Sequence, residues 1–561
     1  MGQTAYGYDA ASQLATVNDG QNNTATYSYL ANSPLVGQIV FATNGVTRMT
    51  TTKQYDYLNR LTQISSQPSA AYTLPLAFNY NYNPANQRTQ DTLADGSYWV
   101  YGYDSLGQVT NGCKYFSDGT PVAGQQFDYT FDTIGNRTQT QTGGNQSGVP
   151  LRVANYYANS LNQITNRDVP GNVDVMGASI LTNTVTVNGQ SAYRKQEYFR
   201  QQLTNDNSTT ALWTNIIVAG GLSVTGNVYV AQEPEHFQYD ADGNLTNDGR
   251  WAYTWDAENR LINLTNNTGM GPLYNLTFVY DAKGRRIQKI VTTNGVGFTT
   301  NTFLYDGWNL VAELGAGNTL LRNYTWGNDL SGTAQGAGGI GGLLGVIYHG
   351  ASATTNAFVA YDGNGNVAAL VNALDGTLLA NYEYGPFGEM IRSTGPLAKS
   401  NPVRFSTKYQ DNESDLIYYG YRYYKADVGN WPNRDPFGEP GAMLLQQPRS
   451  NFDSGPNLYD YVDNNSINLI DPFGLDPGYG NPVSGPTGPI GPSDPYAPGG
   501  PYGPVYNPPP VSCSEGCFYK YVLGITVDTT VIVSGQPIIS KRFVTVGSAE
   551  QVSPIRANVN W

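Results

Sequence analysis

Histidine and cysteine are both scarce in this chain. Its 561 residues include only two histidines, His236 and His349, and three cysteines, Cys113, Cys513 and Cys517. So few His and Cys residues provide few ligands for a zinc site and cannot form a disulfide framework. Cys513 and Cys517 are close enough in sequence to form a local disulfide or to stay reduced, and both states remain open. We expect no metal and no other cofactor.

Charged side chains are also scarce, and acidic residues outnumber basic ones. Asp, Glu, Lys and Arg make up 13% of the chain and the formal net charge is -13, whereas charged residues account for roughly 25% of an ordinary globular protein. A surface that binds nucleic acid needs clustered Lys and Arg to neutralise phosphates. The chain has no such cluster, so we expect no nucleic-acid partner.

Long apolar runs are missing as well. No segment approaches the roughly 18 uninterrupted apolar residues of a membrane-spanning helix, so we expect no membrane span. The first residues also lack the basic stretch and apolar run of a secretory signal. Either the sequence is a fragment of a longer protein, or its export depends on something that the chain does not show.

Glycine and tyrosine, in contrast, are abundant, and they belong to a repeated phrase. The chain has 64 Gly and 43 Tyr residues. The phrase begins with an aromatic residue, any residue, Tyr and Asp. After a short gap it continues with Gly or Asn and then Arg or Gln, and it ends with an aliphatic residue. Such self-similarity indicates an array of like structural units. The copies are Tyr8-Asp9 with Gln13-Leu14, Tyr55-Asp56 with Asn59-Arg60-Leu61, Tyr103-Asp104 with Gly107-Gln108-Val109, Phe131-Asp132 with Gly135-Asn136-Arg137, Tyr239-Asp240 with Gly243-Asn244-Leu245, Trp255-Asp256 with Asn259-Arg260-Leu261, Tyr280-Asp281 with Gly284-Arg285-Arg286, and Tyr361-Asp362 with Gly365-Asn366-Val367.

Each copy predicts a β-hairpin. An alternating aromatic strand leads to an Asp-x-x-Gly turn, in which the Asp side chain can accept hydrogen bonds from its own turn and Gly takes a positive φ. One hairpin cannot bury its apolar face alone, so the copies must stack edge to edge into a continuous sheet. We therefore interpret the repeated Asp residues as structural. The region from Gln141 to Glu233 is degenerate, although Tyr157 to Ile164 still looks like a repeat variant.

Two Asp-Pro-Phe-Gly modules lie near the end of this region. The first begins at Asp435, after Arg434; the second begins at Asp471 and is followed by Leu475, where composition changes abruptly. Two carboxylates held together can share a proton and activate a water against a peptide bond, as in aspartic peptidases. Asp-Pro-x-Gly is also an ordinary turn sequence, because Pro fixes φ and Gly accepts a positive φ. Both interpretations stay open.

A fixed order of further phrases connects the last hairpins to the two modules. They are Tyr305-Asp-Gly-Trp-Asn309, Gly336-Ala-Gly-Gly-Ile-Gly-Gly-Leu343, Tyr361-Asp-Gly-Asn-Gly-Asn366, Tyr384-Gly-Pro-Phe-Gly388, Arg404-Phe-Ser-Thr-Lys-Tyr409 and Tyr418-Tyr-Gly-Tyr-Arg-Tyr-Tyr424. With the Tyr-Asp repeats, they resemble the YD-repeat, or Rhs, family and its Rhs repeat-associated core domain. In that family an all-β spiral of stacked hairpins forms a hollow shell, which the core domain plugs at one end. Members commonly enclose a variable C-terminal toxin and release it by self-cleavage.

The resemblance implies roles for the two modules. Asp435 and Asp471 would be the catalytic carboxylates, and the cut would fall between Leu475 and Asp476. The family often has Gly-Arg-Trp or Gly-Arg-Phe shortly before the first module, whereas this chain has Asn430 in place of that arginine. Arg434, next to Asp435, is a candidate substitute. The alternative is that both modules are capping turns that seal the shell without cleavage.

The chain divides into four predicted parts. Residues 1–302 form the repeat shell, and residues 303–475 form the core domain with the self-cleavage motif. Residues 476–511 are a linker rich in Gly and Pro, without the strict Gly-x-y period of collagen. Residues 512–561 form a small variable segment with strand-like runs, Tyr519 to Val533 and Pro537 to Val546. Having no histidine and few charges, this tail excludes a histidine-metal nuclease.

These observations predict a container that delivers its own C-terminal segment as a toxin or effector, without activity on external substrates. Its partners would be that cargo and, on its route, a secretion apparatus or a cell-surface glycan or protein, with the protein secreted or at the cell surface. If about two thirds of the 475 residues before the cut are strand, the rolled sheet would leave an inner radius of roughly 15 Å, about enough for the tail. A closed shell and an open half-shell both fit. The alternative function is a cell-surface repeat protein that binds glycans or proteins and is not cleaved.

Overall fold

Strands dominate the structure. The computed structural model describes residues 3–71, 73–179, 183–220, 222–350, 353–436 and 457–475, and the backbone of residues 522–533 and 536–548. No α-helix occurs within these ranges, so the predicted all-β fold is confirmed. In the tail, β40 (Val522–Val533) and β41 (Gln536–Ser548) pair antiparallel, where the sequence predicts strands. Asp476, Cys513, Cys517 and the predicted linker lie outside the described residues.

The first large sheet follows the chain strand by strand. Each strand pairs antiparallel with the next, as expected for stacked hairpins. Its fifteen strands are β1 (Ala5–Tyr8), β2 (Leu14–Asn18), β3 (Asn23–Tyr29), β4 (Val36–Thr43), β5 (Val46–Tyr55), β6 (Leu61–Pro68), β7 (Leu76–Tyr82), β8 (Arg88–Leu93), β9 (Tyr98–Tyr103), β10 (Val109–Tyr115), β11 (Pro121–Phe131), β12 (Arg137–Gly143), β13 (Leu151–Ala158), β14 (Ile164–Arg167) and β22 (Glu235–His236).

A second large sheet continues the first almost without a break. Its first strand begins one residue after β22, and the residue between, Phe237, donates its backbone N–H to the carbonyl oxygen of Thr165 at 2.8 Å. The fourteen strands are β23 (Gln238–Tyr239), β24 (Leu245–Asn247), β25 (Trp251–Trp255), β26 (Leu261–Asn266), β27 (Tyr274–Tyr280), β28 (Arg286–Thr293), β29 (Val296–Asp306), β30 (Asn309–Leu314), β31 (Leu320–Trp326), β32 (Leu343–His349), β33 (Thr354–Tyr361), β34 (Val367–Asn372), β35 (Leu378–Tyr384) and β36 (Met390–Thr394).

The degenerate region contains one further hairpin and two small accessory sheets. Asn159 accepts backbone hydrogen bonds from Leu161 and Gln163 at 2.9 and 3.1 Å, so the predicted repeat variant is confirmed, with Asn in place of Asp. The accessory sheets interrupt the array before β22. One contains β15 (Asn172–Ala178), β18 (Tyr193–Lys195) and β19 (Tyr198–Thr204); the other contains β16 (Thr186–Val187), β17 (Gln190–Ser191), β20 (Leu212–Gly220) and β21 (Leu222–Val230).

The repeated Asp residues hold the hairpin turns. In the turn between β11 and β12, Asp132 Oδ1 accepts the backbone N–H groups of Ile134 at 3.0 Å and Asn136 at 2.9 Å. Gly135 has φ +84°, a conformation that side chains other than glycine rarely adopt. In all eight repeat copies the Asp carboxylate accepts a hydrogen bond from the backbone N–H of the residue four positions later. Their structural role is thus confirmed.

The repeated tyrosines link one hairpin to the previous one. Each lies at the end of its strand and donates its hydroxyl to the first carbonyl of the neighbouring strand, so the bond crosses from one repeat to the next. Tryptophans at two such positions, Trp255 and Trp326, do the same with their indole N–H, both at 2.7 Å. The tyrosine pairs are Tyr29 with Leu14, Tyr55 with Val36, Tyr82 with Leu61, Tyr103 with Arg88, Tyr280 with Leu261, Tyr305 with Arg286, Tyr361 with Leu343 and Tyr384 with Val367.

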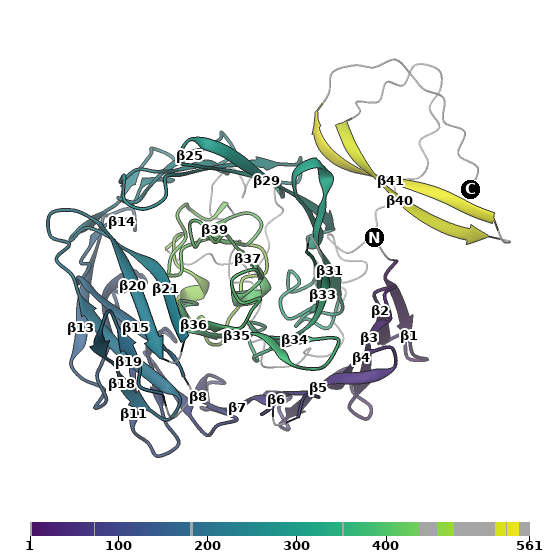
Figure 1. Cartoon of the computed structure of the whole chain (residues 1–561), viewed down its shortest axis with the longest axis horizontal. Coiled ribbons are helices and arrows are strands. Elements are labelled where there is room, and N and C mark those ends of the chain that lie inside the picture. The colour runs from purple at the N-terminus through teal and green to yellow at the C-terminus, as the bar shows by residue number, and fades with distance from the viewer. Residues whose placement is uncertain are drawn as a thin grey trace.

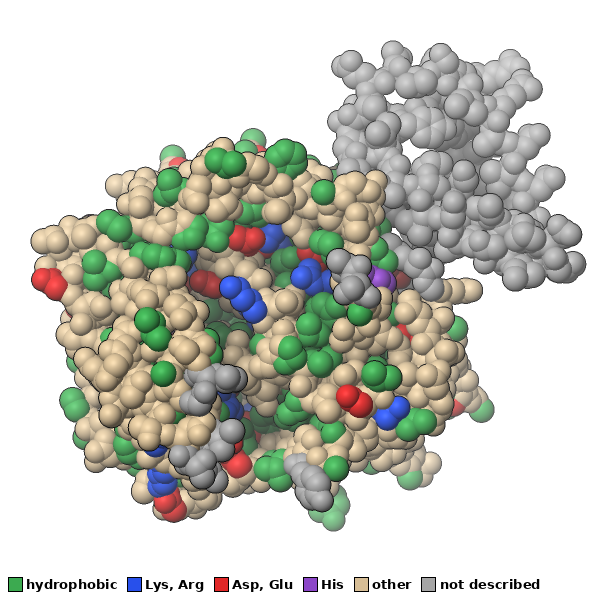
Figure 2. Space-filling model, viewed as in Figure 1, with side chains coloured by type: hydrophobic (Ala, Val, Ile, Leu, Met, Phe, Trp, Pro, Cys, Tyr) green, Lys and Arg blue, Asp and Glu red, His purple; other side chains and the backbone are tan. Residues whose placement is uncertain are grey.

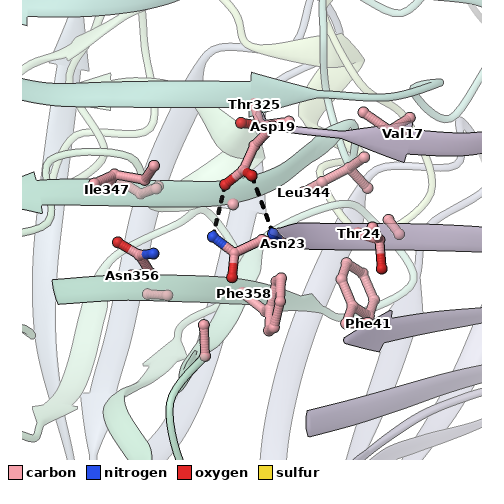
Figure 3. Close-up of a pocket in the computed structure, with 15 residues that line it drawn as sticks. Val17, Asp19, Asn23, Thr24, Phe41, Thr325, Leu344, Ile347, Asn356 and Phe358 are labelled. Atoms are coloured by element: carbon pink, nitrogen blue, oxygen red, sulfur yellow. Dashed lines mark hydrogen bonds between the residues drawn. The ribbon is translucent and has the colours of Figure 1, made fainter. Parts of the chain in front are cut away.

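The two ends of the spiral overlap face to face. Figure 1 shows the wall as a ring in which the first strands lie beside β31 and β33. Buried residues of β2 to β5 and of β32 to β34 form one hydrophobic cluster, in which the rings of Phe41 and Phe358 are 5.2 Å apart. Figure 3 shows this seam, where Asn23 donates to Asp19 from its backbone and its side chain. The remaining gap is about 20 Å³, roughly the room of one water molecule.

Described residues between β36 and Leu475 lie in the centre of the ring. Figure 1 places β37 (Tyr409–Gln410) and β39 (Tyr423–Tyr424) there, and β38 (Ile417–Tyr418) lies between them in one small sheet. The short 3-10 turns η2 (Phe405–Thr407) and η4 (Val462–Asn464) belong to the same region, whereas η1 (Ala316–Asn318) joins two wall strands. Part of the chain before Leu475 therefore lies inside the ring and does not belong to its wall.

Three buried arginines fasten this centre to the wall. Each is the first residue of a wall strand: Arg88 of β8, Arg137 of β12 and Arg286 of β28. Their Nη1 atoms donate to the Ile467 carbonyl at 3.3 Å, the Val428 carbonyl at 2.8 Å and the Asp411 carboxylate at 2.6 Å, respectively. The wall is thus bonded to the central region by arginine side chains that all occupy the first position of their strands.

Loss of a tyrosine hydroxyl tests this account of the wall. Tyr361→Phe removes the 2.6 Å bond to the Leu343 carbonyl, and we expect the free energy of unfolding to fall by about 0.5–1.5 kcal/mol. The matched control is Tyr57→Phe, since Tyr57 is a fully exposed turn residue. Denaturant unfolding measures both. Equal stability of the two variants would contradict the proposed link between hairpins.

Candidate active site

The second Asp-Pro module forms a tight turn capped by its own aspartate. Asp471 Oδ1 accepts the backbone N–H groups of Phe473, Gly474 and Leu475 at 3.0, 2.7 and 3.1 Å. Pro472 lacks an N–H and fixes φ, while Gly474 takes φ +76°, as the turn interpretation predicts. Asp471 is almost fully buried. The turn therefore presents Leu475 at a defined place next to a buried carboxyl group.

The first module places Asp435 beside a different segment. The Asp435 backbone N–H donates to the Leu458 carbonyl at 3.0 Å, and the Trp431 N–H donates to the Tyr459 carbonyl at 2.9 Å. These two bonds join the chain around the first module to the start of the next described segment. Asp435 is 5% exposed, so its carboxylate is held inside the protein.

Arg422 brings the two aspartates together. Its Nη2 lies 2.5 Å from Asp435 Oδ2 and 3.7 Å from Asp471 Oδ2. Its Nε donates to the Gly474 carbonyl at 2.5 Å, one peptide before Leu475. The guanidinium also lies over the Trp431 ring, 4.1 Å from its centroid. A single planar cation therefore contacts both carboxylates and the backbone next to the expected cut.

The site differs from the sequence prediction in its arginine. Arg434 donates from Nε to the Asp242 carbonyl at 2.9 Å, in the turn between β23 and β24, while the bond to the Asp435 carboxylate comes from Arg422. Arg422 was missed, although it lies in the quoted phrase Tyr418 to Tyr424. Asn430, at the place of the family's arginine, is buried and bridges Lys425 and Asp460 through its backbone.

Burial changes the acidity of Asp471. It raises the pKa of the Asp471 carboxyl to about 7; the Arg422 guanidinium opposes this rise and the Asp435 carboxylate adds to it. Arg422 lies closer to Asp435 than to Asp471. Near neutral pH part of the Asp471 population therefore keeps its proton, as the acid of an aspartic pair must.

Other chemically relevant groups are few in the rest of the described chain. No group of three or more His, Cys, Asp or Glu residues there could hold a metal ion. Cys113 has a free, half-buried thiol, and burial raises its pKa. None of the helices within the described ranges is long and apolar enough to cross a membrane.

Similar proteins include a nuclease and a toxin subunit, and the chain spans less than half the length of each. It is 33% identical over 244 residues to the tRNA3(Ser)-specific nuclease WapA of Bacillus spizizenii. This match covers 43% of this chain and 9% of that protein. It is 25% identical over 441 residues to the toxin subunit YenC1 of Yersinia entomophaga, covering 72% and 42%. Among solved structures, a Tc holotoxin pore of Photorhabdus luminescens covers 86% of this chain and 22% of its own, at 16% identity and a TM-score of 0.40. No family model matches the chain.

Removal of Arg422 tests which arginine supports the site. Arg422→Met leaves Asp435 buried without its guanidinium, and breaking a buried pair in this way costs about 3–5 kcal/mol. Arg434→Met is the matched control, because it removes the partly exposed neighbour of Asp435 in the sequence. We expect a clearly larger fall in melting temperature for Arg422→Met. A larger fall for Arg434→Met would return the role to the residue predicted from the sequence.

Proposed function

We propose that the chain is a β-shell that encloses its C-terminal segment and releases it by self-cleavage after Leu475. The observation that carries this proposal is the position of Arg422 Nη2 within 2.5 and 3.7 Å of the Asp435 and Asp471 carboxylates. Two further facts support it: the turn of Asp471 leads directly to Leu475, and the similar proteins include a tRNA nuclease and a toxin subunit.

The proposed reaction is hydrolysis of one peptide bond. Asp435 takes a proton from water as the water oxygen adds to the Leu475 carbonyl carbon, and Asp471 donates its proton to the carbonyl oxygen. The bond to the Asp476 nitrogen then breaks. That nitrogen leaves with the proton held by Asp435, and the hydroxyl returns a proton to Asp471. A peptide held permanently beside its carboxylates needs only one turnover, so fixed geometry supplies much of the rate.

The container part of the proposal rests on the ring and its inner space. Figure 2 shows this face of the ring hollowed, with basic and acidic side chains on the walls of the hollow. A cavity of about 500 Å³ lies between β7 to β9 and β34 to β36. Its lining includes Tyr80, Trp99, Asp91 and Glu383. That volume holds only a short stretch of chain, so the ring as a whole, and not this cavity, supports the container.

Intact-protein mass spectrometry tests the cut. We expect the purified parent chain to yield a fragment that begins at Asp476, and Asp471→Asn and Asp435→Asn to remain whole. Asp463→Asn is the matched control, since Asp463 is an exposed aspartate of the same central region. An intact parent chain would overturn the self-cleavage and favour the uncleaved surface protein.

The pH dependence of cleavage follows from Asp471. Its proton is required as the acid and is lost as pH rises through about 7, so we expect the rate to fall about tenfold per pH unit well above that value. Pulse-labelled cell-free synthesis of the full chain, sampled over time in buffers from slightly acidic to alkaline, measures this rate. A rate that rises steadily across the same range would exclude Asp471 as the acid.

The structure gives the glycan-binding alternative less support. The repeated tyrosines that it would use donate their hydroxyls to wall carbonyls, as Tyr82 and Tyr361 do. Tyr57 and Tyr157 are exposed but lie at different hairpins, and only Tyr6 and Tyr8 of β1 are exposed tyrosines of one strand among the described residues. A ligand that stacks on aromatic faces needs several of them close together, so we retain the container as the proposed function.

A further inference from the structure

The glycine-rich loop at Gly336 to Leu343 forms a rigid support beside the candidate active site. Buried Asp329 fixes its backbone: Oδ2 accepts the N–H groups of Ala337 at 2.7 Å and Gly339 at 3.1 Å. On the other side, the Gly341 N–H donates to Thr407 Oγ1 at 2.8 Å. The loop is therefore held from the wall and from the central region at once.

Lys408 joins this loop to the turn of Asp471. Its ammonium group donates to the Gly338 carbonyl at 2.8 Å and to the Pro472 carbonyl at 2.6 Å. Lys408 is 8% exposed, and it lies over the rings of Tyr419 and Phe473 at 5.5 and 5.9 Å. The contact between loop and turn is close, since a Cβ added at Gly338 would lie 2.0 Å from the Pro472 carbonyl oxygen.

We propose that Lys408 is a positioning residue for the cut after Leu475, because its ammonium group clamps the Pro472 carbonyl onto the glycine-rich loop. This inference rests on the proposed function. The clamped carbonyl belongs to the turn that carries both Asp471 and Leu475, so movement of Pro472 would move the acid and the peptide bond together. A misplacement of about 1 Å can lower a rate roughly 100-fold.

The charge of Lys408 also acts on the acid. Burial lowers the pKa of the Lys408 ammonium to about 8, and the carboxyls of Asp471 and Asp329 partly offset this. The attraction is mutual, so the ammonium favours the ionised form of Asp471. The other groups that face Asp471 are Arg422, Asp435 and the Tyr461 hydroxyl. Removing the Lys408 charge therefore raises the pKa of Asp471 further and extends its acid form to higher pH.

Cleavage of Lys408→Met gives the first test. Methionine keeps most of the length of the side chain but cannot donate a hydrogen bond or carry the charge. We expect cleavage of the full chain in pulse-labelled cell-free synthesis to slow by about 10- to 100-fold at neutral pH. We also expect the alkaline decline in rate to move to higher pH, which a general loss of packing would not produce.

Gly338→Ala tests the clamp without removing a charged group. Its added methyl group meets the Pro472 carbonyl oxygen, so cleavage should slow while the alkaline decline stays where it is in the parent chain. Gly317→Ala is the matched control: Gly317 has φ +64°, close to the +60° of Gly338, but nothing lies within 4 Å of its added Cβ. It should cleave like the parent chain.

The outcomes separate this inference from the proposal beneath it. If Asp471→Asn is still cleaved, the self-cleavage mechanism itself is wrong. If Asp471→Asn stays intact while Lys408→Met and Gly338→Ala both cleave at the parental rate and with the parental pH dependence, the clamp is wrong and the mechanism stands. If Lys408→Met fails to fold, the comparison of Gly338→Ala with Gly317→Ala still decides.

Discussion

A hairpin with one apolar face cannot bury that face alone and must pack beside another hairpin. The wall therefore depends on the contacts that join each hairpin to its neighbour. The Asp side chain closes each turn from within, as Asp132 does. Where the residue before that Asp is Tyr or Trp, as at Tyr55, Tyr103 and Trp255, it also donates to a carbonyl at the start of the preceding strand. Turn closure and attachment to the neighbouring hairpin thus come from two adjacent residues. This explains why the pair recurs through the array while the strand residues vary.

The same repeat position serves two purposes, according to the residue that occupies it. Where Leu14, Leu61 or Leu261 begins the returning strand, the side chain joins the hydrophobic interior. Where Arg286 stands there, its guanidinium pairs with buried Asp411 at 2.6 Å and lies 4.7 Å from the Tyr418 ring centroid. A buried arginine is costly unless it is paired. At such positions the stability of the wall therefore depends on the central region being packed against it.

The features that could be predicted from the sequence are local ones. A turn is decided by residues within a few positions, so the hairpins and the variant with Asn159 followed from composition and spacing. Contacts between distant segments could not be predicted in this way, because adjacency in sequence does not reveal where a side chain points: Arg434 donates to the Asp242 carbonyl, while Arg422 contacts Asp435 from a neighbouring segment.

The two interpretations of the Asp-Pro module are compatible at Asp471. One carboxylate oxygen accepts three backbone N–H groups and fixes the turn, while the other lies toward Arg422, which pairs with Asp435. A capping aspartate cannot leave its turn without losing all three bonds. If Asp471 is the acid, these three hydrogen bonds hold it in a fixed position relative to Leu475 and the peptide bond on which it would act. The same turn chemistry that makes the motif look ordinary would give the proposed one-turnover reaction its geometry.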